Sequence, residues 1–82
     1  MIKLNKQVES LEAMQEKIQE KIDALEEKKE AIEEKAYERE SGENTDRELE
    51  RIEELEEQID ELQQEYDDIE TALDYLREYI EY

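Results

Sequence analysis

The chain has 82 residues, of which 49% are charged and 35% hydrophobic, and its formal net charge at pH 7 is −18. A chain this short forms one small domain, and its composition is typical of a long helix or coiled coil. The negative charge argues against direct binding to nucleic acid or to an anionic membrane, because both would repel it.

Neither a leader nor a membrane segment is predicted. The start, MIKLNK, lacks the apolar core of a signal peptide, and no apolar run approaches membrane-spanning length. The chain has no cysteine, so packing must stabilise it without disulfides. We therefore expect a cytoplasmic protein with no membrane association.

The first half of the chain has a seven-residue repeat. An apolar residue recurs at every seventh position: Leu4, Leu11, Ile18, Leu25 and Ile32. The position four residues after each of these holds Val8, Gln15, Ile22, Lys29 and Ala36. This spacing is typical of a left-handed coiled coil and predicts a helix over about residues 3–40.

Gln15 and Lys29 interrupt the apolar repeat, and two interpretations remain open. In the first, Lys29 lays its methylene groups on a facing leucine with its ammonium in water, and Gln15 fixes the register of the helices. In the second, the two residues belong to a buried polar network or a ligand site.

A break follows at ESGENTD, residues 40–46. Gly42 is the only glycine, and glycine commonly ends a helix in the left-handed conformation. Thr45 and Glu48 have the spacing of a capping box, and Asp46 adds negative charge to the first turn of the next helix. A turn over about residues 41–45 is therefore predicted, in preference to one continuous helix of about 120 Å.

The second half repeats without interruption over a helix predicted at about residues 46–81. Its apolar positions alternate in steps of three and four: Ile52, Leu55, Ile59, Leu62, Tyr66, Ile69, Leu73, Leu76 and Ile80. If the chain folds back about Gly42, facing core residues have numbers that sum to about 84, as for Ile22 with Leu62 and Leu25 with Ile59. The sequence predicts an all-α, antiparallel two-helix coiled-coil hairpin.

Apolar residues outside this repeat indicate a second contact surface. They gather toward the end of the hairpin opposite the turn: Met14, Ala72, Tyr75, Tyr79 and Tyr82. Tyrosine supplies a large contact area with a polar tip, so we expect a self-association surface and a homodimer, with a four-helix arrangement as its form. The alternative is that these residues only widen the core within one chain.

The sequence gives little support for catalysis. Histidine and cysteine are absent, which removes the commonest general base, the thiol nucleophile and the soft metal ligands. Gly42 comes too early in ESGENTDRELE for a calcium-binding EF-hand loop. We expect no enzyme activity, no cofactor and no metal site.

The charge is unevenly distributed between the two predicted helices. Residues 1–42 hold 12 acidic and 8 basic residues, whereas residues 43–82 hold 17 and 3. In the second helix a carboxylate recurs at every heptad, as a pair in the first three and followed by a tyrosine in the last two, and this set points away from the core. We call this set the acidic array: Glu53, Glu54, Asp60, Glu61, Asp67, Asp68, Asp74 and Glu81.

In its size, its charge and this array, the chain resembles the small acidic nucleic-acid-mimic inhibitors of phages and mobile elements, including anti-restriction and anti-CRISPR proteins. The resemblance implies a stoichiometric inhibitor that occupies the Lys/Arg-lined channel of a basic nucleic-acid-binding protein. The alternative is a structural or adaptor hairpin that acts through self-association and helix–helix contacts. A designed or fragmentary coiled coil is a third interpretation.

Overall fold

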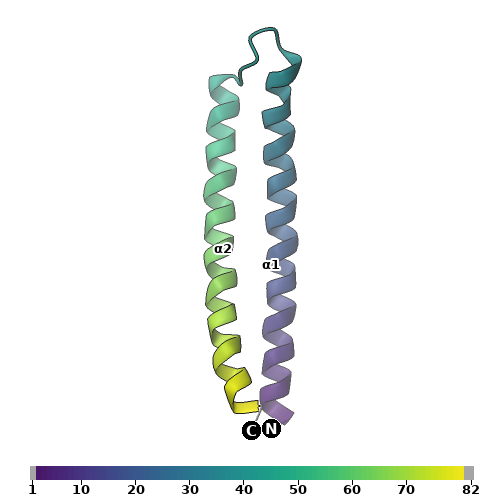
Figure 1. Ribbon diagram of the computed structural model, residues 1–82, viewed down its shortest axis with the longest axis vertical. Helices are drawn as coiled ribbons and strands as arrows, with labels where there is room; N and C mark the ends of the chain where they lie inside the picture. Colours follow the sequence, from purple (N-terminus) through teal and green to yellow (C-terminus); the bar gives the residue numbers. More distant parts are fainter. Residues whose placement is uncertain (1, 81–82) are drawn as a thin grey trace.

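The computed structural model describes the chain from residue 2 to residue 80, and the side chains from residue 5 to residue 79. Two long helices, α1 (Ile2–Glu34) and α2 (Asp46–Ile80), are joined by the short 3-10 helix η1 (Lys35–Glu38) and a loop. The long helices lie antiparallel and side by side in a rod of 62 × 15 × 15 Å (Figure 1). The predicted helical hairpin is confirmed, and a continuous helix is excluded.

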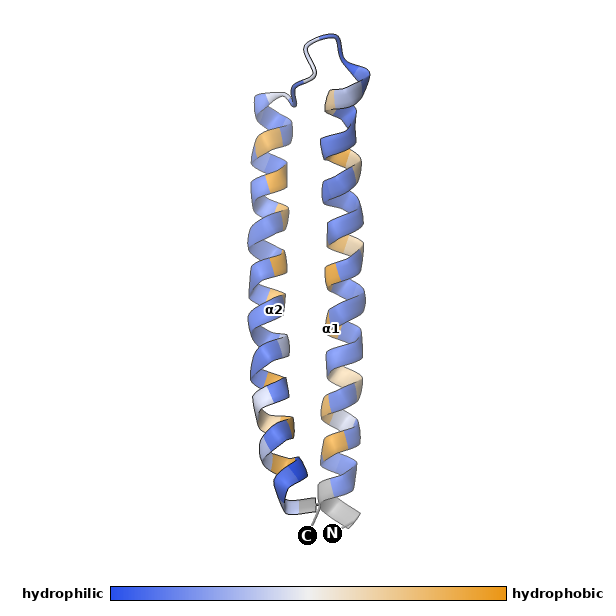
Figure 2. Ribbon diagram, in the orientation of Figure 1, coloured by the Kyte–Doolittle hydropathy of each residue, from blue (hydrophilic) through white to orange (hydrophobic). Residues whose placement is uncertain are grey.

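The helices form because most of their residues are strong helix formers, with glutamate, lysine, leucine, glutamine and alanine prominent. No proline interrupts them, and the only glycine lies in the loop. Isolated helices gain little stability in water, so packing of one apolar stripe against the other must stabilise the pair. Figure 2 shows apolar residues on the sides of α1 and α2 that face each other.

The core follows the register that the sequence predicts. Ile18, Ile22 and Ile59 form a buried cluster, and Leu25, Leu62, Tyr66 and Ile69 pack against it. These residues include the expected partners Ile22 with Leu62 and Leu25 with Ile59. On either side of this cluster along α2, Leu55 and Leu73 are fully buried.

The two kinds of core position are not equally buried. We label the heptad so that Gln15, Ile22 and Ile59 occupy position a, and Leu25 and Leu62 occupy position d. Among the described side chains, six of the nine a positions are buried, but only two of the nine d positions are. One side of the seam between the helices is therefore closed, and the other side is partly open.

The first helix ends earlier than residue 40. Its α-helical part stops at Glu34, and η1 continues the chain in a tighter form to Glu38. Ala36 stays buried at a core position, and Arg39 then becomes extended, with φ −99° and ψ 148°. The extended backbone turns the chain toward α2, which a further helical turn would not do.

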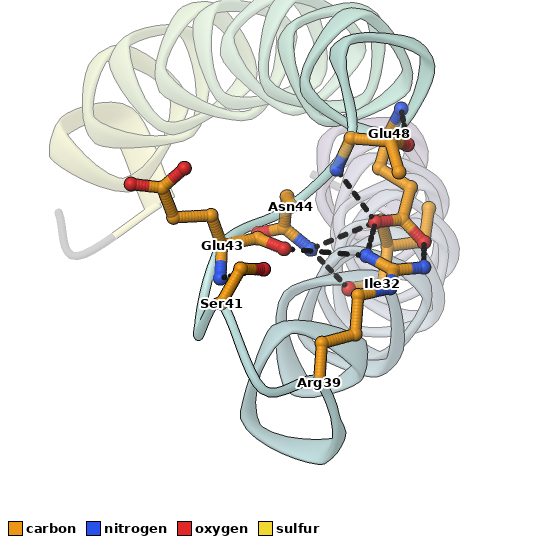
Figure 3. A network of polar contacts seen from close by, with 7 residues as sticks. Ile32, Arg39, Ser41, Glu43, Asn44 and Glu48 are labelled. Carbon is orange, nitrogen blue, oxygen red and sulfur yellow. Dashed lines mark hydrogen bonds and ion pairs between the residues drawn. The ribbon is translucent and has the colours of Figure 1, made fainter.

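Polar contacts close the loop (Figure 3). The capping box is present, because the amide of Glu48 donates to Thr45 Oγ1 over 3.2 Å and the amide of Thr45 donates to Glu48 Oε1 over 3.0 Å. The Asn44 side chain donates to the Ile32 carbonyl over 2.9 Å, which ties the start of α2 to the end of α1. Gly42 has a φ of +68°, the left-handed conformation expected at this position.

Gln15 is the only buried polar residue among the described side chains, with 7% of its surface exposed. Its Nε2 donates to the Tyr66 carbonyl over 3.3 Å and to Glu70 Oε2 over 2.8 Å. Both acceptors are on α2, so the side chain fixes the position of one helix along the other. The geometry favours the register-fixing interpretation of Gln15, because its hydrogen bonds are made within the hairpin.

Gln15→Leu is expected to stabilise the hairpin by about 1 kcal/mol, because it buries added apolar surface in the core. Glu70 keeps a second partner, since Arg77 Nη1 lies 3.4 Å from its Oε1. Urea unfolding of this variant, with the exposed Gln19→Leu as its control, measures the effect. A lower stability for Gln15→Leu than for the unmodified chain would show that the hydrogen bonds of Gln15 outweigh apolar packing here.

Neither α1 nor α2 contains, between residues 2 and 80, a stretch that is apolar and long enough to cross a membrane.

Candidate functional site

The structure exposes every described member of the acidic array. Glu53, Glu54, Asp60, Glu61, Asp67, Asp68 and Asp74 all lie on the surface of α2, and Glu81 lies outside the described residues. Two of the seven are paired: Glu54 lies 3.1 Å from Arg51, and Asp74 lies 3.7 Å from Arg77. Within residues 5–79, the other five have no lysine or arginine partner within 4 Å. Their charge is available to a partner.

The array does not form a single ladder. Asp60 and Asp67 border grooves on the closed side of the seam, beside Ile59 and Tyr66 respectively. Glu61 borders a different groove on the open side, beside Leu62. The two lines of carboxylates that the sequence places next to each other therefore belong to different faces of the hairpin.

The closed side of the seam is strongly acidic. We call it the acidic face and define it by heptad positions b and e of both helices. Within the described side chains these positions carry fourteen carboxylates and one cation, Arg77. The carboxylates are Glu9, Glu12, Glu16, Asp23, Glu26, Glu30, Glu33, Asp46, Glu53, Glu56, Asp60, Asp67, Glu70 and Asp74.

Seven of these carboxylates come from α1, although the first half of the chain carries the smaller net negative charge. Its lysines occupy other heptad positions, so the net charge of α1 conceals how acidic one of its sides is. The sequence contains this information, because assigning heptad positions to both helices shows that the carboxylates concentrate at b and e while the lysines of α1 lie elsewhere. Sorting charge by face instead of by helix would have found it.

The carboxylates of the two helices come together in one groove of the acidic face. Glu26, Glu30 and Glu33 from α1 line it together with Glu56 and Asp60 from α2. Lys29 is the only cation that lines this groove, and its Nζ lies 3.5 Å from Glu56 Oε1. Among the side chains that the structure describes, no three carboxylates converge closely enough to hold a metal ion.

The open side of the seam carries charges of both signs. We call it the mixed face and define it by heptad positions c and g of both helices. Its described side chains in the helices include five carboxylates and six cations. One groove brings Lys21 and Lys28 of α1 together with Glu61 and Glu65 of α2, and Leu25 and Leu62 also line it. This face is close to neutral in a chain whose net charge is −18.

The residues predicted for self-association also occupy the mixed face. Met14 is 49% exposed, Tyr75 66% and Tyr79 65%, and Ala72 is exposed as well. They do not widen the core within one chain, because each keeps a large accessible surface. Tyr82 lies outside the described residues.

The carboxylate with the most strongly shifted pKa is Glu48, in the first turn of α2 beside the loop. Arg39 forms a two-pronged ion pair with Glu48, in which Nη2 lies 2.8 Å from Oε2. This hydrogen bonding, with that from the Thr45 amide, holds the pKa of Glu48 well below its usual range. The pKa of Arg39 is raised by the same contact. The pair is satisfied within the loop, so we assign it a structural role.

Comparison with known protein families, with curated proteins and with solved structures finds no match to this chain.

Proposed function

We propose that the chain is a non-enzymatic protein-binding module. Its acidic face enters the basic nucleic-acid channel of a target protein and blocks it as a stoichiometric inhibitor. The observation that carries this proposal is the fourteen carboxylates of the acidic face, against only Arg77 at the same heptad positions and Lys29 in the groove. A face needed only for solubility would mix charges of both signs, as the mixed face does.

The density of charge suits such a channel. The fourteen carboxylates span a stretch of rod on the order of 42 Å long, at 1.5 Å per helical residue, or one charge for about every 3 Å. A nucleic-acid strand carries one phosphate for about every 3.4 Å of helix axis. A lysine- and arginine-lined channel would therefore meet a similar charge per unit length on the acidic face.

The proposal is tested by competition. The immobilised chain is exposed to the heparin-binding proteins of a cell extract, and each captured protein is then loaded with a fluorescent oligonucleotide. The free chain is expected to displace the oligonucleotide at one chain per site, with an affinity that falls as salt rises. An oligonucleotide that stays bound beside the chain would contradict the proposal.

Two variants with equal loss of charge locate the surface that binds. Glu53→Gln/Asp60→Asn/Asp67→Asn neutralises part of the acidic face, and Glu54→Gln/Glu61→Gln/Asp68→Asn neutralises the same number of charges on the mixed face. At about 0.2–1 kcal/mol for each of the three exposed charge pairs, the first variant should raise Kd by a factor of about 3 to 150. The second should change Kd much less. Equal losses would mean that net charge, and not the acidic face, determines binding.

A structural or adaptor hairpin is the second candidate, and the exposed apolar residues of the mixed face favour it. An adaptor would tolerate neutralisation of the acidic face, because its contacts would use Met14, Tyr75 and Tyr79. Tyr75→Ser/Tyr79→Ser should then abolish partner binding while the helical content measured by circular dichroism is unchanged.

A further inference from the structure

The mixed face combines an open apolar seam with balanced charge. Leu25 and Leu62 lie half-buried at the bottom of its groove, beside Ala24. Toward the chain ends the same face exposes Met14, Tyr75 and Tyr79. A two-helix hairpin of this size has little core of its own, so covering this seam would add a substantial share of its apolar burial.

Charge restricts what can cover the seam. Two acidic faces would repel each other strongly, but two mixed faces carry five carboxylates and six cations each within the described helices. The cations Lys21 and Lys28 lie on α1, whereas the carboxylates Glu61 and Glu65 lie on α2. The face is therefore complementary to a copy of itself when α1 of one chain lies against α2 of the other.

We propose that two copies of the chain pair through their mixed faces into a four-helix bundle with both loops at the same end. The two-fold axis runs parallel to the helices, so each α1 packs against α2 of the second copy. Lys21 then lies level with Glu65 of the second copy, and Lys28 lies between its Glu54 and Glu61. Lys35 near Arg51 at the loop end is the one like-charged contact in this arrangement.

The opposite arrangement, with the loops at opposite ends, is disfavoured by the same residues. It would place α1 against α1 and α2 against α2 of the second copy. Lys21 would then lie against Lys21, and Glu61 near Asp68. Met14 would lie near Lys28 instead of joining the other apolar residues at the chain ends.

A pair of complementary charge reversals tests the helix pairing. Lys28→Glu and Glu61→Lys, each alone, should raise the dissociation constant of the homodimer at least tenfold, because each places like charges together at both contacts. A mixture of the two variants should form a heterodimer about as readily as the unmodified chain forms its homodimer. Sedimentation equilibrium measures all three, and circular dichroism verifies that each variant is helical.

A matched control uses residues at the outermost heptad position of each helix. Lys6→Glu and Glu57→Lys make the same charge changes on exposed side chains away from both grooves. Neither should change dimerisation, alone or in a mixture. Strict monomers of the unmodified chain at high micromolar concentration, or a mixture that fails to pair, would overturn the proposal.

The direction of the two chains is tested with a spin label. The chain has no cysteine, so Glu40→Cys places a single thiol on an exposed loop residue. Loops at the same end should give an electron–electron distance of about 20 Å, since bundled helices pack 8–10 Å apart. A distance close to the 62 Å length of the rod would overturn the proposed direction.

The proposed dimer gives the adaptor function a specific form, and it does not require the chain to be an inhibitor. The acidic faces remain on the outside of the proposed bundle, and Lys28→Glu leaves them unchanged. Displacement of an oligonucleotide by monomeric Lys28→Glu would therefore support inhibition without the dimer. An unmodified chain that dimerises but displaces no oligonucleotide would support the dimer without inhibition.

Discussion

Replacing Leu55 with alanine is expected to remove 2–5 kcal/mol from the free energy of unfolding, and Leu73→Ala a similar amount. Both side chains are fully buried, with 0% of their surface exposed. Each change would leave a cavity that two straight helices can close only by shifting along their whole length. A single core in a chain this small rarely supplies more than about 3–5 kcal/mol, so either variant should lose a large part of its stability.

Circular dichroism during urea unfolding measures this loss, with Leu49→Ala as the control. Leu49 lies near the start of α2 and is 49% exposed, so its truncation should cost far less. Repeating the measurement over a range of protein concentrations separates the stability of one hairpin from any stability that dimerisation adds. A Leu55→Ala variant as stable as Leu49→Ala would show that this part of the core contributes little.

The pairing of the two helices was predictable because it depends on local patterns that reinforce one another. The seven-residue spacing identified the stripe on each helix, and Gly42 with the Thr45–Glu48 capping box identified the turn. Once the turn is placed, antiparallel geometry leaves one register in which Ile22 meets Leu62. The contacts between the two helices therefore follow from the position of the turn and from the repeat in each helix.

The division of the surface into two faces was accessible from the sequence but not from the net charge of each helix. Glu61 and Asp60 are neighbours in the chain, yet they border different grooves because consecutive helical residues point about 100° apart. The early end of α1 was a different case. There Arg39 has left the helical conformation and pairs with Glu48, and helix propensity carries no information about such a contact.

Glu48→Gln is expected to destabilise the hairpin more than any glutamate-to-glutamine change on the outer surface of α2. Glu48 accepts hydrogen bonds from Arg39, Asn44 and the Thr45 amide, so one residue holds three parts of the loop. Thr45→Ala removes the reciprocal capping bond and should cost about 1 kcal/mol. The fall in Tm for Glu48→Gln should exceed that for Thr45→Ala, because the charged pair with Arg39 is lost as well. Glu50→Gln, at an exposed site in the same helical turn, is the control.

The pH dependence of this difference follows from the lowered pKa of Glu48. A carboxyl whose pKa is lower in the folded state stabilises the fold at pH values above its unfolded pKa, and this contribution is lost as pH falls toward the folded value. The stability difference between the unmodified chain and Glu48→Gln should therefore be constant from pH 7 to about 5 and shrink below the usual glutamate value of 4.5. Protonation of other carboxylates relieves the repulsion of a chain with charge −18 and acts on both proteins alike, so the comparison isolates the loop. The stability difference between the two proteins could instead stay constant down to strongly acid pH. That result would show that Glu48 stabilises the loop through hydrogen bonds that do not require its charge, and that glutamine does not reproduce them.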